Sequence, residues 1–181
     1  MPRIVRDKDH PQTGHMEPIG FPAQRELRWF PIRSFPRRAF ELRSKDRVMG
    51  AIWEPPFRPE GHATPADGEW IFRGPRFLDR RIAVVGKNPI RDIALLNLNW
   101  RWRGTVRFSD GRSFLWHPTK GPDYVLATSA GVPLLRTRPT SAFLEKSIGR
   151  VQIEPAAASL NELSLLVLLS WYTIVAQPSG T

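Results

Sequence analysis

The chain has 181 residues, 41% of them hydrophobic, with seven Trp, ten Phe and a net charge of +10. This length and apolar content suffice for one domain with a packed core and argue against a disordered chain. The absence of cysteine excludes disulfides, thiolate metal sites and cysteine nucleophiles, and it fits a reducing cytoplasm.

The positive charge is concentrated in the middle of the chain. Residues 69–157 carry 15 basic and 7 acidic side chains, whereas residues 1–68 carry 12 and 9. Only five of the 27 basic residues are lysines, and a GC-rich bacterial genome also produces such an arginine bias. Net charge constrains solubility and non-specific partners rather than the fold.

The N-terminal third combines a polar arm with short strands. Residues 1–24 contain four prolines and no hydrophobic periodicity, which predicts an extended or disordered arm. The arm lacks the apolar run of a secretory signal, so we expect a cytoplasmic protein. Residues 25–30, 38–44 and 47–53 are predicted to be strands, and the Pro- and Gly-rich segment Glu54–Gly68 a long loop between two structured parts.

The clearest strand pattern lies in residues 96–108, LNLNWRWRGTVRF. Large apolar residues alternate with polar ones as far as Arg103, and this period of two is typical of a half-buried strand. Gly104 is predicted to mark a bend or bulge, after which the alternation resumes. We therefore expect Trp100 and Trp102 to lie in the core and Arg101 and Arg103 in solvent.

Further strands follow at short spacing, with turn residues between them. Asp110-Gly111 lies between apolar alternations and predicts a hairpin, and Ala130-Gly131 predicts a second one. Other candidate strands occupy residues 69–73, 80–87, 112–118, 122–129, 132–138 and 149–155. About ten to twelve short strands of this kind indicate a mainly β fold, a closed antiparallel barrel.

The segment Leu163–Ala176, LSLLVLLSWYTIVA, is apolar around its whole circumference, so a helix here must be buried on every side. We predict a helix over residues 158–177, with Ser159 and Glu162 in capping-box spacing. A bilayer span needs about 20 apolar residues, whereas 14 helical residues extend roughly 21 Å, the width of a small core. A central barrel helix is the preferred interpretation; a C-terminal tail anchor and an oligomer interface are the alternatives.

Strands in hairpins followed by a hydrophobic helix resemble the tubby C-terminal-like superfamily, which includes tubby proteins, LURP-one-related proteins and phospholipid scramblases. Residues 106–116, 124–138 and 149–176 carry the resemblance, which covers residues 69–176 and more loosely 25–176; the last segment is similar to the end of small bacterial proteins of this kind. It implies a barrel of about twelve strands around a central helix and action at membranes. The chain has no cysteine and no Asp-rich calcium loop, so scrambling is not expected, and tubby's phosphoinositide-binding residues have no position-by-position counterparts.

The sequence contains no recognisable catalytic motif, which predicts a non-enzymatic protein without a cofactor. The polar arm contains His10 and His15, and we interpret this part of the arm as solvated and expect no metal. Ser113 and His117 lie on one predicted strand, roughly 13 Å apart, which is too far for a catalytic pair.

The Trp-Arg-Trp-Arg run is the most prominent candidate for a binding site in the sequence. If it forms a strand, its arginines face outward, away from the tryptophans, and form a basic ladder with arginines of a neighbouring strand. The ladder is predicted to consist of Arg80, Arg81, Arg101, Arg103 and Arg107. Such a surface would bind anionic lipid headgroups at the inner face of the membrane. A nucleic-acid-binding barrel and a scaffold for a protein partner are the alternatives.

Overall fold

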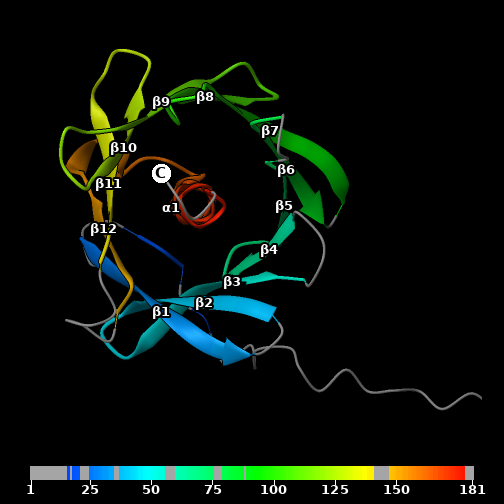
Figure 1. The fold of residues 1–181 in the computed structure, drawn as a ribbon, viewed down its shortest axis with the longest axis vertical. Helices are drawn as coiled ribbons and strands as arrows, with labels where there is room; N and C mark the ends of the chain where they lie inside the picture. Colours follow the sequence, from blue (N-terminus) through cyan, green and yellow to red (C-terminus); the bar gives the residue numbers. More distant parts are fainter. Residues whose placement is uncertain are drawn as a thin grey trace, which may run out of the picture.

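The computed structural model shows a closed antiparallel β-barrel with one helix along its axis (Figure 1). It describes residues 16, 18–20, 25–34, 37–55, 60–75, 79–87, 89–140 and 147–177. The strands are β1 (Glu26–Ser34), β2 (Arg37–Ser44), β3 (Arg47–Glu54), β4 (Glu60–Pro65), β5 (Trp70–Arg73), β6 (Arg81–Lys87), β7 (Ile90–Leu98), β8 (Gly104–Phe108), β9 (Ser113–Pro118), β10 (Tyr124–Thr128), β11 (Pro133–Pro139) and β12 (Gly149–Ile153). A 3-10 turn (Pro155–Ala157) and the helix α1 (Leu163–Val175) follow β12. The predicted fold class is confirmed.

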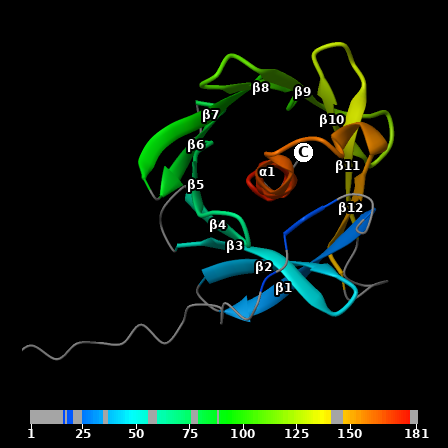
Figure 2. The same ribbon diagram turned by 180° about the vertical axis from the view of Figure 1, so that it is seen from behind.

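The barrel is built from neighbouring strands in chain order and closes by pairing its first strand with its last. In the closing pair, Glu26 of β1 lies opposite Gln152 of β12, and Trp29 lies opposite Gly149. Closure leaves no strand edge unpaired, so every strand has a hydrogen-bonded neighbour on both sides. Figure 2 shows the same closed ring from behind, with α1 again at its centre.

Both hairpins predicted from glycine-containing turns are present. Gly111 has φ +90° in the turn between β8 and β9, and Gly131 has φ +83° in the turn between β10 and β11. Glycine adopts a positive φ without steric cost. A glycine between two alternating apolar segments therefore predicts a short hairpin turn.

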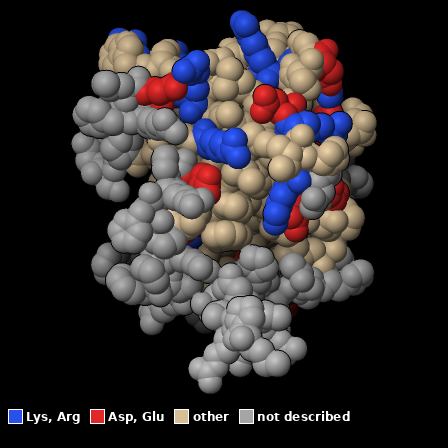
Figure 3. Space-filling view, turned by 90° about the vertical axis from the view of Figure 1, so that its right-hand side faces the viewer, with Lys and Arg blue, Asp and Glu red and all other residues tan. Residues whose placement is uncertain are grey.

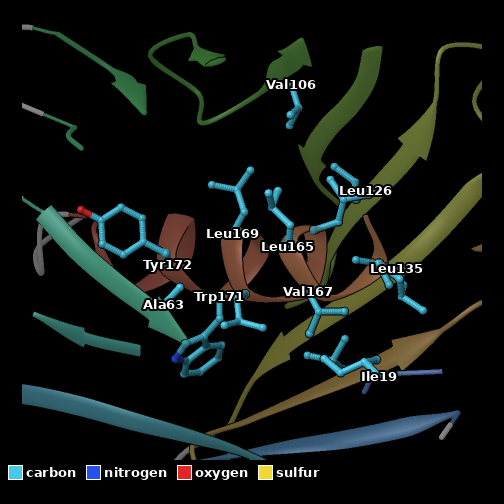
Figure 4. Packing of buried hydrophobic residues seen from close by; sticks show 14 of the residues in the cluster. Ile19, Ala63, Val106, Leu126, Leu135, Leu165, Val167, Leu169, Trp171 and Tyr172 are labelled. Carbon is cyan, nitrogen blue, oxygen red and sulfur yellow. The ribbon is translucent and has the colours of Figure 1, made fainter. Parts of the chain in front are cut away.

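Helix α1 is surrounded by strands, as its fully apolar circumference required. In Figure 4, Leu165 and Leu169 point toward Val106, whereas Trp171 points to the opposite side. Leu168 is fully buried, and the hydroxyls of two polar residues of α1 donate to carbonyl oxygens one turn earlier at 2.7 Å. In the described part of the chain, no helix is both long enough and apolar enough to cross a bilayer.

The helix is shorter at its start than the predicted span of residues 158–177. It begins at Leu163, and Glu162 at its N-cap makes no side-chain capping hydrogen bond, so the predicted capping box is wrong. The Glu162 carboxylate instead accepts from Arg112 in the β8–β9 turn, with Nη1 and Oε2 2.8 Å apart. The Glu162 carboxylate thus binds the guanidinium of Arg112, outside the helix, rather than a backbone N–H group at the start of the helix.

Helix α1 packs closely against the closing seam between β1 and β12. The ring of Trp171 stacks on Trp29 with centroids 5.3 Å apart. A Cβ added to Gly149 would lie 2.2 Å from Cζ3 of Trp171, so the absence of a side chain there makes room for the indole. The helix and the seam between β1 and β12 therefore depend on each other.

Segment Glu54–Gly68, predicted to be a loop, contains the strand β4. The strand was not predicted because this segment is rich in proline and glycine, which disfavour strands and are typical of turns. Here Gly61 faces the interior, where an added Cβ would lie 2.6 Å from Cε2 of Tyr172. The glycine is needed for close packing against α1. A residue type that is common in loops therefore occurs here in a strand because a larger side chain would not fit.

The N-terminal arm also contributes to the interior. Ile19 is 7% exposed, belongs to the core cluster and lies near Val167 in Figure 4. Ile19 thus packs into the core although it belongs to the segment predicted to be an extended or disordered arm. Most of the arm, including His10 and His15, and the predicted tail of residues 178–181 lie outside the described residues.

Hairpin connections alternate between the two ends of the barrel because consecutive strands are antiparallel. The end that carries the β7–β8 and β9–β10 connections also receives the C-terminus of α1. There Tyr172 donates its hydroxyl to the carbonyl of Gly74 at 2.5 Å, and Tyr124 donates to Oε1 of Gln177 at 3.0 Å. We call this end the tryptophan end, after the side chains described next.

Candidate anionic-surface interface

The Trp-Arg-Trp-Arg run forms a turn rather than a strand. Strand β7 ends at Leu98 and β8 begins at Gly104, and residues 99–103 between them form what we call the tryptophan loop. The side chain of Asn99 organises the turn, because its Oδ1 accepts from the backbone N–H of Arg101 at 2.9 Å and of Arg103 at 3.1 Å. The prediction of one strand that continues through this run is therefore wrong.

The turn brings an indole into solvent. Trp100 is 69% exposed, and Trp102 is half-buried with φ +57°. The expectation that both tryptophans are core residues is wrong for Trp100. Two other large apolar side chains of the described part are strongly exposed, Ile90 and Val132, and both lie in or beside turns at the opposite end of the barrel.

Arginines lie against both tryptophans of the loop. The guanidinium carbon of Arg101 is 4.3 Å from the ring centroid of Trp100, and that of Arg80 is 5.5 Å from the ring of Trp102. Arg80 also donates to the carbonyl of Asn99 at 3.4 Å. Cations and aromatic rings thus share one surface, contrary to the expectation that they face opposite ways.

The five arginines of the predicted ladder do not form a ladder. Arg81 is held by Asp79, with Nε and Oδ1 2.7 Å apart, and this hydrogen bond raises the pKa of the guanidinium. Arg107 is exposed on β8, opposite Leu95, and is separated from the loop residue Arg103 by three strand residues.

Three arginines of the predicted set do gather at the tryptophan end with their charge uncompensated. Arg80, Arg101 and Arg103 form no ion pair with any residue that the structure describes. Arg91 and Arg107 likewise form no ion pair with a described residue, whereas several other basic side chains of residues 69–157 are paired with carboxylates. Arg136, for example, binds Glu154 at 2.7 Å, and Arg138 binds Asp123 and lowers the pKa of that carboxyl.

Figure 3 shows one side of the barrel, the side on the right in Figure 1. In the described part of this face, basic and acidic side chains lie next to one another, and neither sign forms a patch of its own. Ion pairs among the described residues include Lys87 with Glu69, 2.8 Å apart, and Arg81 with Asp79. On this side of the barrel, the described residues therefore form no continuous basic face.

Sequence reasoning missed the exposed indole because the alternation of Trp and Arg continues past the end of the strand. The signal that could have located the turn is Asn99, since asparagine side chains accept hydrogen bonds from backbone groups two residues on and so initiate turns. Among the described residues, no group of three or more His, Asp or Glu side chains is placed to hold a metal ion.

The chain matches none of the protein-family models, curated proteins or solved structures with which it was compared. A twelve-stranded barrel around a central helix is the architecture that the resemblance to the tubby C-terminal-like superfamily implies. An architecture alone does not identify a superfamily or a function, so membership stays a prediction.

Proposed function

We propose that this barrel is a non-enzymatic protein that binds anionic phospholipid surfaces through its tryptophan end. The observation that carries the proposal is the exposed indole of Trp100 next to Arg101 and Arg103, two cations without a described acidic partner. Indole rings favour the boundary between water and lipid, and arginines beside them can reach the phosphates. The proposed location is the cytoplasmic face of the membrane, where anionic lipids are enriched.

The energetics fit a reversible peripheral contact. A basic residue near an anionic membrane contributes about 1 kcal/mol, so Arg80, Arg101 and Arg103 together contribute about 3 kcal/mol. That corresponds to roughly a hundredfold in affinity. The turn is already held by the Asn99 hydrogen bonds, so little backbone order has to be gained when the loop meets a membrane.

Vesicle flotation tests the proposal. Wild-type protein is expected to float with phosphatidylglycerol vesicles but not with phosphatidylcholine vesicles, and added salt should weaken the binding. Trp100→Ala, and separately Arg101→Gln combined with Arg103→Gln, should each reduce the bound fraction about tenfold.

Two matched controls lie at the opposite end of the barrel. Ile90→Ala removes another exposed apolar side chain, and Arg91→Gln removes another exposed arginine, so both should leave flotation unchanged. Failure of the wild-type protein to float with either kind of vesicle would sink the proposal, and so would equal loss in the control variants.

A second candidate is supported by the same contact between Trp100 and Arg101. Single-stranded nucleic acid is bound by aromatic rings that stack on bases and by arginines that pair with phosphates, and the loop presents both groups together. A salt-dependent mobility shift of an oligonucleotide that is lost in Trp100→Ala would favour this candidate, particularly if the oligonucleotide also displaced the protein from vesicles.

A further inference from the structure

A recess lies beside the tryptophan loop, on the outer surface of the barrel. It is shallow and open to solvent, with a volume of about 540 Å³, and begins where the loop ends, at Arg103 and Gly104. The other lining residues belong to β9 and the turn after it: Leu115, Trp116, His117, Pro118, Thr119 and Lys120. The recess therefore adjoins the proposed membrane-binding loop without containing Trp100.

The lining combines cations with apolar groups. Arg103 and Lys120 are exposed, and neither forms an ion pair with a residue in the described ranges. Leu115 and Pro118 supply apolar surface between them, and the His117 ring adds a further nitrogen. A ligand that satisfies this lining is an anion attached to a small apolar group.

The acidic residue nearest in the chain is already engaged elsewhere. Asp123 ends the β9–β10 turn, and both of its carboxylate oxygens accept from Arg138, at 2.5 and 2.9 Å. Within that turn, the backbone N–H of Gly121 donates to the Thr119 hydroxyl at 3.1 Å, and that of Thr119 donates to the carbonyl of Asp123 at 2.8 Å. The turn is thus ordered in a way that leaves Lys120 without a carboxylate.

We infer that the recess binds the phosphate and glycerol portion of a single anionic phospholipid. Arg103 and Lys120 pair with the phosphate from two sides, and the glycerol and the first acyl carbons lie against Leu115 and Pro118. This inference rests on the proposed function, because it names the lipid that the tryptophan end would meet at a membrane. It adds a defined site to what would otherwise be a diffuse attraction between charges.

Short-chain lipids that stay monomeric in water test the site apart from membrane binding. The protein is titrated, with amide NMR shifts as the readout, with dihexanoyl phosphatidylglycerol, dihexanoyl phosphatidylcholine and glycerol 3-phosphate. We expect saturable shifts at Gly104, Leu115 and Thr119 with phosphatidylglycerol, and affinities at least tenfold lower for the other two compounds. Arg103→Gln combined with Lys120→Gln should weaken phosphatidylglycerol at least tenfold, whereas Arg91→Gln should have no effect.

The outcomes separate the inference from the proposed function. Trp100→Ala should bind the short-chain lipid like the wild type while it fails to float with vesicles. If the wild-type protein floats but shows no saturable shifts at the recess, the inference is wrong and the proposed function stands. If glycerol 3-phosphate binds as tightly as the lipid, the ligand is a free organic phosphate, and equal binding of phosphatidylcholine would mean that charge is not recognised; either result overturns the inference.

Discussion

The helix α1 and the tryptophan loop are both rich in large apolar residues, yet one is enclosed by the barrel and the other projects into solvent. In α1 the apolar residues cover every direction around the axis, so burial is the only arrangement available to them. In the loop, tryptophans alternate with arginines, and that pattern fits a half-buried strand as well as an exposed turn. The apolar pattern of α1 predicts burial because no exposed helix would fit it. The alternation in the loop does not, because it fits both a half-buried strand and an exposed turn.

A charge placed in α1 is expected to have the largest effect on stability. Leu168→Asp would bury an unpaired carboxylate at a fully enclosed position, which costs at least several kcal/mol, comparable to the total stability of a domain. We expect the variant to be insoluble or unfolded by circular dichroism, whereas Leu168→Met should cost less than about 1.5 kcal/mol. A folded, soluble Leu168→Asp protein would refute the central position of the helix.

Two tryptophan substitutions compare the regions directly. Trp171→Ala empties part of the core and should lower the free energy of unfolding by about 3–5 kcal/mol, because Trp171 is 2% exposed and stacks on Trp29. Trp100→Ala should change it by less than about 0.5 kcal/mol, since the side chain is mostly in solvent. Urea denaturation of both variants measures the difference, and equal losses would contradict the assignment of Trp100 to the surface.

Gly149→Ala probes how tightly the helix fits the seam. The added methyl group would meet the Trp171 indole and should destabilise the protein by about 1–3 kcal/mol. Gly121→Ala is the matched control, because the nearest atom to its added Cβ is 3.8 Å away. A neutral effect of Gly149→Ala would show that the indole can move aside and that the seam is loosely packed.

The smallest effect concerns the contact that joins α1 to a surface turn. The hydrogen bond from Arg112 lowers the pKa of Glu162 from its usual value of 4.5. A depressed carboxyl pKa stabilises the folded protein above the unfolded-state pKa, and this contribution is lost as pH falls below about 4.5. Melting temperatures of wild type and Glu162→Gln should therefore differ slightly at pH 7 and converge on acidification; a constant difference would exclude the linkage.

Much of the fold could be predicted because its signals are local. The turn glycines Gly111 and Gly131, the alternation within β8 and β9, and the apolar circumference of α1 each depend on residues close together in the chain. Less of the candidate site could be predicted. Arg80, Arg101 and Arg103 were identified, but the exposure of Trp100 and the recess at Lys120 were not.

The sequence alone establishes that a fully apolar helix must be shielded from water on every side, and the short length of this helix makes a barrel interior the preferred shield over a bilayer or an oligomer interface. The tertiary structure was needed to show which surface residues lie together. Trp100 is exposed because the Asn99 side chain closes a turn, and Arg81 is neutralised because Asp79 lies beside it. Those outcomes depend on strand ends and on side-chain partners in three dimensions, which alternation along the chain does not specify.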